Sequence, residues 1–420
     1  MEVIIVGAGI GGLTLALTLH QAGIASRVFE AAPEIRPIGV GINVLPHASR
    51  ELARLGLEDA LAAVAVTTQE SAFFNRYGQL IHREPAGRAA GYDWPQFSIH
   101  RGDLQQVLLD AFLQRLGADR LHVGWQCTGF AQTPAEATAH FRNPTTRSLL
   151  ASQSAAVVIA CDGLHSAIRR QLHPGEGEPV YSGVNMWRGV SAWPPFLSGA
   201  SMVRAGWLAT GKMVIYPIRN NIDREGRQLV NWVAEIVTPT HHRRDWNRRG
   251  ALADFIDSYA DWHFGWLDVP ALIRAADTIL EFPMIDQEPL PWWSRGRVTL
   301  LGDAAHPMVP RGSNGAGQAI LDARALADAL AGERDPVAAL KAYETARLDA
   351  TATIVRTNRT NPPDAILREV YERTGDTPFA RIEDVISADE LDAMSQGYKR
   401  IAGYDRQTLA AEAARPAPTA

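Results

Sequence analysis

Residues 2–12 read EVIIVGAGIGG, and this short stretch points to the architecture of the N-terminal part of the chain. The β-branched run at 2–6 predicts a strand, and the glycines after it predict a tight turn. The following LTLALTLHQAG, at 13–23, has the apolar spacing of a helix and ends in glycine, and RVFE at 27–30 predicts a second strand. A strand, a helix and a strand in this order open an α/β, Rossmann-like fold.

The glycines of this stretch form the pattern G-x-G-x-x-G at Gly7, Gly9 and Gly12. The first glycine permits the turn, the second lets a pyrophosphate approach the backbone, and the third lets the helix pack against the strand. The start of the helix then offers N–H groups and a partial positive charge to phosphates. Glu30, at the end of the second strand, can accept hydrogen bonds from ribose hydroxyls and disfavours a 2′-phosphate. The sequence therefore predicts a dinucleotide site for FAD or NAD.

Composition and charge restrict the class of protein. A chain of 420 residues is too long for one ordinary core, so we expect two domains, or one domain with a large insert. The net charge of −5 argues against nucleic acid or an anionic membrane as main partners, and no apolar run is long enough to span a membrane. Cys127 and Cys161 are too few for a disulfide framework or a metal cluster. We expect a cytoplasmic protein without a metal, and a monomer and a homodimer both stay open.

The rest of the chain mixes helical and strand-like patterns. Helices are expected at 46–66, 100–117 and 337–357, and buried strands at 155–163 and 297–306. From about 180 to 292, strand-like runs alternate with polar turns, and nine of the eleven tryptophans lie between Trp187 and Trp293. This aromatic-rich segment predicts an inserted antiparallel sheet that forms a substrate domain.

Two further motifs follow buried strands. The first reads CDGLHSAIR at 161–169, and by itself it could be an ordinary turn into a helix, with its Asp and Ser as caps. The second reads LGDAAHP at 301–307 and continues as PRGSNGAGQ at 310–318. An aspartate at a strand end can hold the hydroxyls of a polyol, and the N–H groups at the following helix start can stabilise negative charge. The alternative interpretation of this second motif is an ordinary capped helix without a ligand.

The order of the three motifs resembles that of the single-component FAD-dependent aromatic monooxygenases, the para-hydroxybenzoate and salicylate hydroxylase superfamily. The resemblance covers about residues 1–355. It implies FAD as a resident, non-covalent cofactor, NADH or NADPH as co-substrate, and O2. Stretches such as GVGINVLPHA at 39–48 and MWRGV at 186–190 are most similar to members of the family that modify phenazines.

The resemblance also implies roles for individual residues. The first glycines and Glu30 would bind the ADP half of FAD, Asp303 the ribityl chain, and the loop from Pro310 to Gly317 the pyrimidine edge of the flavin. The DG motif would shield FAD and contribute to the NAD(P)H interaction, and Cys127 would contact adenine through its backbone. The complete set of implied cofactor-binding residues is Gly7, Gly9, Gly12, Glu30, Gly41, Arg101, Cys127, Asp162, Gly163, Ser166, Arg169, Gly302, Asp303, Pro310, Gly315, Ala316 and Gly317.

The family layout further implies a discontinuous domain organisation. The expected segments are an FAD-binding domain at 1–70, 100–180 and 285–355, a β-sheet substrate domain at 71–99 and 181–284, a C-terminal helical region at 356–405, and a disordered tail at 406–420.

The implied activity is hydroxylation of an aromatic or heteroaromatic small molecule through a flavin C4a-hydroperoxide. A phenazine or an aromatic carboxylate is the expected substrate, with or without loss of the carboxylate. A non-oxygenating flavin oxidoreductase and a flavin-binding regulatory protein stay open as alternatives. A halogenase is disfavoured, because DWHFGW at 261–266 does not match the tryptophan motif of those enzymes.

The substrate pocket is predicted less directly. Tyr216, Trp232 and Met284 lie in apolar strands of the substrate domain, and each can equally be a core residue. His47 follows a loop that runs close to the flavin in the family, and packing at a helix start is its alternative. Arg188 could pair with a substrate carboxylate, but we expect it to face solvent or an acid.

Overall fold

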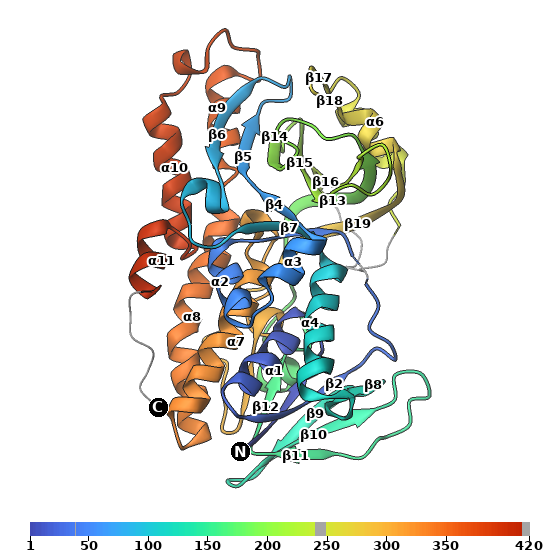
Figure 1. The fold of residues 1–420 in the computed structure, drawn as a ribbon, viewed down its shortest axis with the longest axis vertical. Helices are drawn as coiled ribbons and strands as arrows, with labels where there is room; N and C mark the ends of the chain where they lie inside the picture. The colour runs from blue at the N-terminus through green and yellow to red at the C-terminus, as the bar shows by residue number, and fades with distance from the viewer. Residues whose placement is uncertain (38, 240–248, 414–420) are drawn as a thin grey trace.

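The computed structural model describes residues 1–37, 39–239 and 249–413. The N-terminal strand lies at the centre of a five-stranded parallel sheet in the order β20-β12-β1-β2-β8 (Figure 1). Its strands are β1 (Glu2–Val6), β2 (Ala25–Glu30), β8 (Leu121–Val123), β12 (Val157–Ala160) and β20 (Val298–Leu300). The β-branched residues of β1 are almost completely buried, as expected for the central strand of a parallel sheet.

Four long helices cover this sheet. They are α1 (Ile10–Gln21), α4 (Arg101–Leu116), α7 (Gly315–Gly332) and α8 (Pro336–Thr360). Helix α1 packs against α4 and α7, and α7 packs against α8. The starts of α1 and α7 therefore meet at the carboxyl-terminal edge of the parallel strands, where open α/β sheets bind their ligands.

A seven-stranded sheet forms the second large layer, above the parallel sheet in Figure 1. Its strands, in spatial order, are β19 (Ala276–Asp286), β13 (Val180–Trp193), β16 (Gln228–Val237), β15 (Gly211–Arg219), β14 (Ser201–Trp207), β5 (Glu70–Phe74) and β6 (Leu80–Pro85). All neighbours are antiparallel except β14 and β5. Helix α6 (Val269–Arg274) and the short pair β17 (His263–Phe264) and β18 (Leu267–Asp268) pack on one face around a tryptophan-rich core.

Two small sheets accompany the layers, one beside β15 of the seven-stranded sheet and the other packed on the parallel sheet. One three-stranded sheet contains β3 (Gly41–Val44), β4 (Val66–Thr68) and β7 (Gln96–His100), and another contains β9 (Gln126–Gln132), β10 (Ala137–Arg142) and β11 (Gln153–Ala155). The remaining helices on the cofactor side are α2 (Pro46–Arg54), α3 (Glu58–Val64) and α5 (Ala167–Leu172). The single helix predicted at 46–66 is thus two helices, because the chain turns at Gly56, which has a φ of +70°.

The C-terminal helices are α9 (Ala365–Thr374), α10 (Ala388–Ile401) and α11 (Arg406–Ala413). Helix α9 packs on β14 and β5, so this region covers the far end of the seven-stranded sheet. The predicted boundary at 355/356 falls inside α8. The prediction of a disordered tail is wrong for 406–413, where Leu409 is buried and Asp405 caps α11 by accepting a hydrogen bond from the N–H of Thr408. Residues 414–420 of that prediction lie outside the described residues.

The predicted fold class is confirmed: a Rossmann-like parallel sheet is combined with a largely antiparallel sheet and C-terminal helices. The residue bounds of the domains stay a prediction. Within the described residues no helix has both the length and the apolar character needed to cross a membrane.

Candidate active site

A cavity of about 300 Å³, which we call the main cavity, lies between the two layers. Its lower wall comes from the starts of α1 and α7 and from the loops after β12 and β20, and its upper wall comes from the seven-stranded sheet. Ten of the sequence-predicted residues line it, namely Gly9, Gly41, Arg101, Gly163, Tyr216, Gly302, Asp303, Pro310, Gly315 and Ala316. The structure thus brings together residues from all three motifs.

The three motif glycines have different roles in the N-terminal loop. Gly7 has a φ of +104°, and a Cβ there would lie 2.4 Å from the carbonyl oxygen of Cys161. A Cβ on Gly12 would lie 2.0 Å from the carbonyl oxygen of Gly7, so helix and loop pack too closely for any side chain. A Cβ on Gly9 would meet no protein atom within 4 Å, because Gly9 faces the main cavity. Gly7 and Gly12 therefore determine the conformation of the loop, and Gly9 leaves space in the main cavity beside the loop.

Glu30 fixes the same loop from behind. Its Oε2 accepts a hydrogen bond of 2.8 Å from the N–H of Ala8, and its Oε1 accepts one of 2.8 Å from the N–H of Ala32. Glu30 does not line the main cavity, but its carboxylate is half-buried at the end of β2 and keeps further lone pairs for a ribose.

Two helix starts without side-chain caps point into the main cavity. Gly9 precedes α1 and Asn314 precedes α7, and neither helix has a side-chain cap hydrogen bond or an acid in its first turn. The first N–H groups of both helices are therefore left without an intrahelical partner, with the positive end of the helix dipole beside them. Asp303 is exposed in the same cavity, and its carboxylate has no partner among the described residues.

Of the DG motif at 161–169, only Cys161 and Gly163 line the main cavity, and the other residues hold the surrounding loops in place. Gly163, with a φ of +72°, forms part of the wall, whereas Asp162 lies behind it and accepts a hydrogen bond of 3.1 Å from the N–H of Ala167. Burial raises the pKa of Asp162 to about 6. Ser166 caps α5. Arg169 is buried and donates to the carbonyl oxygens of Ala304 and Ala305 at 2.8 and 2.9 Å, which holds the turn that carries Asp303.

The loop at 310–317 is braced by the C-terminal helices. Asn314 donates a hydrogen bond of 2.8 Å to the hydroxyl of Tyr398 in α10, and that hydroxyl donates one of 2.7 Å to Asn358 in α8. A Cβ on Gly312 would lie 1.8 Å from the same hydroxyl, so the loop and Tyr398 are in close contact. Nothing in the local sequence signals this brace, because the partners are 84 residues apart.

The upper wall of the main cavity is mostly apolar. Residues that the sequence analysis did not predict contribute here, namely Ile42, Asn43, Met186, Phe282, Pro283, Ile285 and Met308. Tyr216 is buried in this wall and is hydrogen-bonded to Arg188. The expectation for Arg188 was wrong: its guanidinium lies in the cavity wall and donates a hydrogen bond of 2.8 Å to the carbonyl oxygen of Gly41.

Three of the four predicted pocket residues do not line the main cavity. Trp232 is fully buried in the core beneath α6 and donates a hydrogen bond of 3.1 Å to the hydroxyl of Ser191. Met284 is fully buried behind the cavity wall. His47 is buried at the start of α2, where it packs against Gly317 and stacks on Tyr404 with 5.4 Å between the ring centroids. Burial, together with the nearby guanidinium groups of Arg347 and Arg50, lowers the pKa of His47 to about 3. Cys127 also lies away from the cavity, in β9.

His306 is buried beside Pro307 and has a structural role. Its Nε2 lies 2.5 Å from the carboxylate of Asp322, which also accepts hydrogen bonds from Arg347 and from the N–H of Gly302. The imidazole and the guanidinium hold the pKa of Asp322 at about 2, against the effect of burial. This network fixes the turn at Gly302 against α7.

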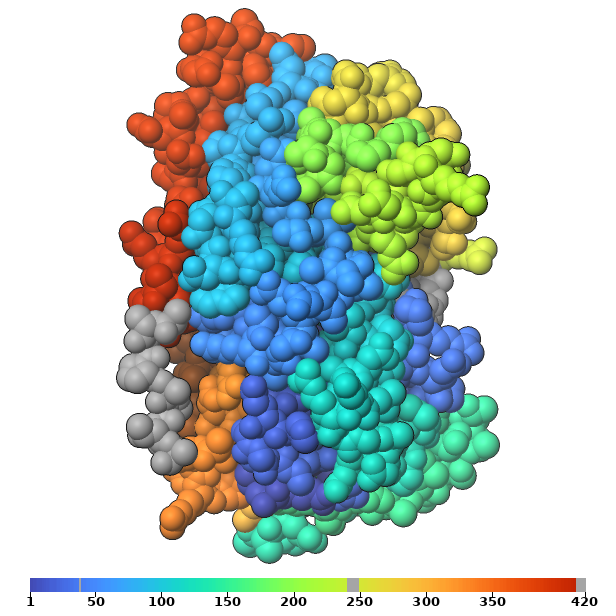
Figure 2. Space-filling model, in the orientation of Figure 1, coloured from blue at the N-terminus to red at the C-terminus, as the bar shows by residue number. Residues whose placement is uncertain are grey.

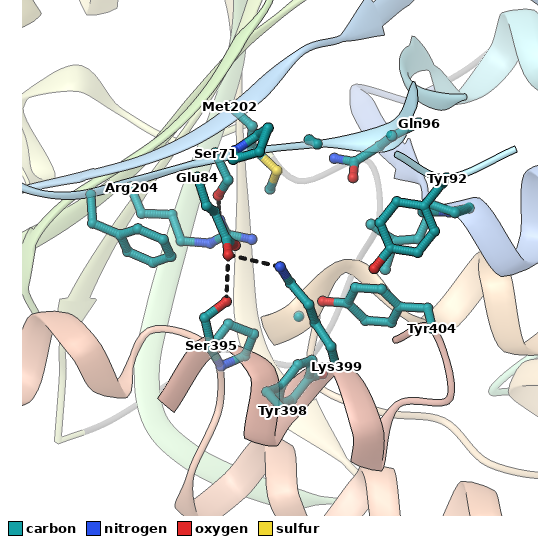
Figure 3. A pocket seen from close by; sticks show the side chains of 18 of the residues that line it. Ser71, Glu84, Tyr92, Gln96, Met202, Arg204, Ser395, Tyr398, Lys399 and Tyr404 are labelled. Carbon is teal, nitrogen blue, oxygen red and sulfur yellow. Dashed lines mark hydrogen bonds and ion pairs between the residues drawn. The ribbon is translucent and has the colours of Figure 1, made fainter. Parts of the chain in front are cut away.

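A second, smaller cavity of about 40 Å³ lies on the other side of the loop that contains Gly312 (Figure 3). We call it the tyrosine cavity. It is lined by apolar residues, among them Leu45, Pro46, Phe73, Met202 and Ile366, and by polar residues that include Ser71, Glu84, Tyr92, Gln96, Arg204, Tyr398, Lys399 and Tyr404. Leu45 and Pro46 follow β3, whose residues 41–43 line the main cavity, and Met202 packs against Tyr216. The two cavities are therefore neighbours.

Several polar groups of the tyrosine cavity are unpaired. The hydroxyls of Tyr92 and Tyr404 point towards its middle in Figure 3. Within the described part of the chain, these hydroxyls and the buried amide of Gln96 have no hydrogen-bond partner. These groups are therefore free to hydrogen-bond to a molecule inside the cavity.

Charged residues fix one side of the tyrosine cavity. Arg204 is ion-paired with Asp364 at 3.1 Å and donates a hydrogen bond of 2.8 Å to Ser71. Lys212 is ion-paired with both Asp364 and Glu235, and all four charged side chains are buried. Because Asp364 directly precedes α9, this cluster connects the C-terminal helices to the seven-stranded sheet.

The residues present fit an FAD molecule in the main cavity. An uncapped helix start beside Gly9 suits a pyrophosphate, the free carboxylate of Asp303 suits a polyol, and the uncapped start of α7 suits the electron-rich edge of a flavin. These groups converge on one cavity although they come from opposite ends of the chain.

Comparison with known proteins agrees with this site. A family model described as an FAD binding domain matches residues 1–358. Phenazine 1,6-dicarboxylic acid hydroxylase PhzS of Lysobacter antibioticus is 44% identical over 362 residues, which cover 85% of this chain and 89% of that protein. A 3-amino-4-hydroxybenzoate 2-monooxygenase of Streptomyces platensis is 35% identical over 85% of this chain and 87% of that protein. The crystal structure of Klebsiella pneumoniae HpxO complexed with FAD and uric acid matches with a TM-score of 0.76 and 25% identity, and covers 97% of both chains. The predicted resemblance and the predicted FAD cofactor are confirmed.

Proposed function

The chain belongs to the FAD-binding-domain family of flavin-dependent aromatic hydroxylases, and we propose that it hydroxylates a heteroaromatic carboxylate of the phenazine class. In the proposed reaction NADH or NADPH supplies two electrons, one oxygen atom of O2 enters the ring as a hydroxyl, and the other leaves as water. Where the hydroxyl replaces a ring carboxylate, that carboxylate leaves as carbon dioxide. The convergence of two uncapped helix starts and Asp303 on one cavity is the observation that carries the proposal.

Each part of FAD has a matching group in the main cavity. The loop at Gly7–Gly12 and Glu30 would hold the ADP half, Asp303 the ribityl hydroxyls, and the N–H groups of Gly315 and Ala316 the pyrimidine edge. When bound, FAD supplies the redox chemistry that passes electrons from NAD(P)H to O2. The protein positions that ring, stabilises negative charge with the start of α7, and excludes water with the apolar upper wall.

The tyrosine cavity supports the choice of an aromatic substrate. It adjoins the loop that would face the flavin, and it offers an apolar slot with unpaired hydroxyl and amide groups. Arg188 in the main cavity wall has no carboxylate partner among the described residues and can face a substrate carboxylate. The identity of 44% to a protein named for a phenazine dicarboxylic acid supports the phenazine class.

The test is turnover by the purified holoenzyme. NADH and NADPH oxidation would be followed with phenazine carboxylates, hydroxybenzoates and indole-like aromatics, while hydroxylated product and peroxide are assayed in the same samples. We expect a phenazine carboxylate to stimulate oxidation and to yield product in proportion. Oxidation that yields only peroxide with every compound would instead favour a non-oxygenating oxidoreductase. FAD binding without any stimulated oxidation would favour a regulatory flavoprotein.

A further inference from the structure

A surface groove leads to the tyrosine cavity from outside. The groove is lined by the segment at 90–94 and by residues of α10 and α11. Figure 2 shows the segment around 84–94 beside the C-terminal helices on one face of the molecule. The groove and the tyrosine cavity share four lining residues, namely Glu84, Pro85, Tyr92 and Lys399. These residues are therefore the partition between solvent and the cavity.

An ion pair closes this partition. Lys399 of α10 donates a hydrogen bond of 2.7 Å to Oε2 of Glu84 at the end of β6, and Ser395 donates a second one of 2.7 Å to the same oxygen (Figure 3). Only 12% of the Lys399 side chain and 15% of the Glu84 side chain are exposed. We call Glu84 and Lys399 the gate pair. It joins an edge strand to a helix, and no backbone hydrogen bond links these two elements.

The inner end of the tyrosine cavity abuts the loop that borders the main cavity. Gly312 lies in its wall, and the following residues Ser313 and Asn314 lie in the wall of the main cavity. Groove, gate pair and tyrosine cavity therefore follow one another from the surface inward, and the loop at 312–314 separates the tyrosine cavity from the main cavity. This route does not pass through the cleft around Gly9 and Asp303 that FAD would fill.

We propose that the aromatic substrate enters the active site through this groove, and that the Glu84–Lys399 pair is the gate that opens to admit it. This inference rests on the proposed function, because it concerns the substrate of that reaction. The gate must open, since the tyrosine cavity of about 40 Å³ is too small for a tricyclic ring in the closed state. A route separate from the cofactor cleft lets FAD stay bound while substrate and product exchange.

The experiment blocks the groove with a bulky label. Asp392, Gln396, Lys399 and Arg400 line the groove from one face of α10, and Gln396 is exposed. Gln396→Cys in the holoenzyme would be labelled with a polyethylene glycol maleimide. Ala393→Cys is the matched control, because Ala393 is exposed on the same helix but does not line the groove. Wild-type protein treated in the same way controls for the native thiols, of which Cys127 is buried and Cys161 lies in the main cavity.

We expect the label on Gln396→Cys to lower kcat/KM for the aromatic substrate by about tenfold or more, because substrate association becomes restricted. The flavin spectrum and the substrate-independent oxidation of NAD(P)H should not change. Equal kcat/KM for the two labelled variants would overturn the gate and leave the proposed function standing. Failure of the unlabelled Gln396→Cys enzyme and of wild type to hydroxylate any aromatic would overturn the proposed function, and the gate with it.

A second pair of variants tests the gate pair itself. Glu84→Gln keeps the side-chain shape but removes the charge attraction to Lys399. We expect it to raise the association rate constant of the substrate in stopped-flow measurements of the flavin absorbance, with a smaller change in kcat. Asp376→Asn is the matched control, since it weakens the ion pair between Arg76 and Asp376, which also joins the β5–β6 turn to the C-terminal region but lies outside the groove. Unchanged association in Glu84→Gln, or an equal increase in Asp376→Asn, would contradict the role of the gate pair.

Discussion

Substitution of Gly9 by alanine separates cofactor binding from folding. Gly9 has φ −72° and ψ −175°, which alanine adopts without strain, and its added Cβ would touch no protein atom. The new methyl group would occupy the space where the pyrophosphate of FAD approaches the start of α1. We therefore expect Gly9→Ala to fold normally and to bind FAD weakly.

The expected loss follows from the hydrogen bonds at risk. A hydrogen bond to a charged group contributes about 1.5–3 kcal/mol, and the methyl group displaces the phosphate from at least one such N–H group. A loss of about 3 kcal/mol corresponds to a dissociation constant for FAD that is about a hundredfold higher. The apoprotein should be equally stable or slightly more stable, by about 0.4–1 kcal/mol, because alanine restricts the unfolded chain.

The assay is a fluorescence titration of the apoprotein with FAD, combined with thermal unfolding of the apoprotein. Gly265→Ala is the control, because Gly265 is also free of close contacts and is exposed far from the main cavity. Gly12→Ala gives the opposite contrast, since its Cβ would lie 2.0 Å from the oxygen of Gly7 and should disturb both folding and binding. An unchanged dissociation constant for FAD in Gly9→Ala would refute the assignment of this loop to the pyrophosphate.

Three further predictions concern other parts of the site. Asp303→Asn should leave the thermal stability of the apoprotein unchanged, because the carboxylate has no partner among the described residues. It should weaken FAD binding about tenfold or more in the same titration, and normal FAD retention would exclude a ribityl contact. Trp232→Ala should lower the free energy of unfolding, measured in urea, by about 3–5 kcal/mol. Tyr216→Phe should lower it by only about 1 kcal/mol but should lower kcat/KM. A small loss of stability with a large loss of kcat/KM in Trp232→Ala would place Trp232 in the pocket. The imidazole of His47 stays neutral down to its pKa of about 3, but the unfolded chain takes up the proton below about pH 6.5, so the free energy of unfolding should fall by about 1.4 kcal/mol per pH unit below that value. His47→Gln should lose this component between pH 7 and pH 5, and parallel stability curves for the two proteins would contradict it.

The cofactor half of the site was predictable because its signals are local. A G-x-G-x-x-G pattern between a strand and a helix usually forms the same phosphate-binding turn. An aspartate that directly follows a buried parallel strand lies at the carboxyl-terminal edge of the sheet, whatever the position of that strand in the sheet. The structure accordingly brings Gly9, Gly163, Asp303 and Gly315 to one cavity.

The substrate half was not predictable in the same way. Strand β16 has a run of six buried residues, so the alternation that normally tells one face of a strand from the other is missing. Trp232 therefore gave no sign that it faces the core beneath α6, and the same holds for Met284 in β19. The tyrosine cavity combines residues from β6 and α10 that are more than 300 positions apart, and only long-range packing brings them together.

Incorporation of oxygen from 18O2 tests the central claim most directly. The holoenzyme would be incubated with NAD(P)H, the aromatic carboxylate that stimulates oxidation most, and 18O2, and the product would be examined by mass spectrometry. The account predicts one labelled oxygen atom per product molecule in the new hydroxyl group, and none when the label is in water. A product whose new oxygen comes from water, or stimulated oxidation without an oxygenated product, would contradict it.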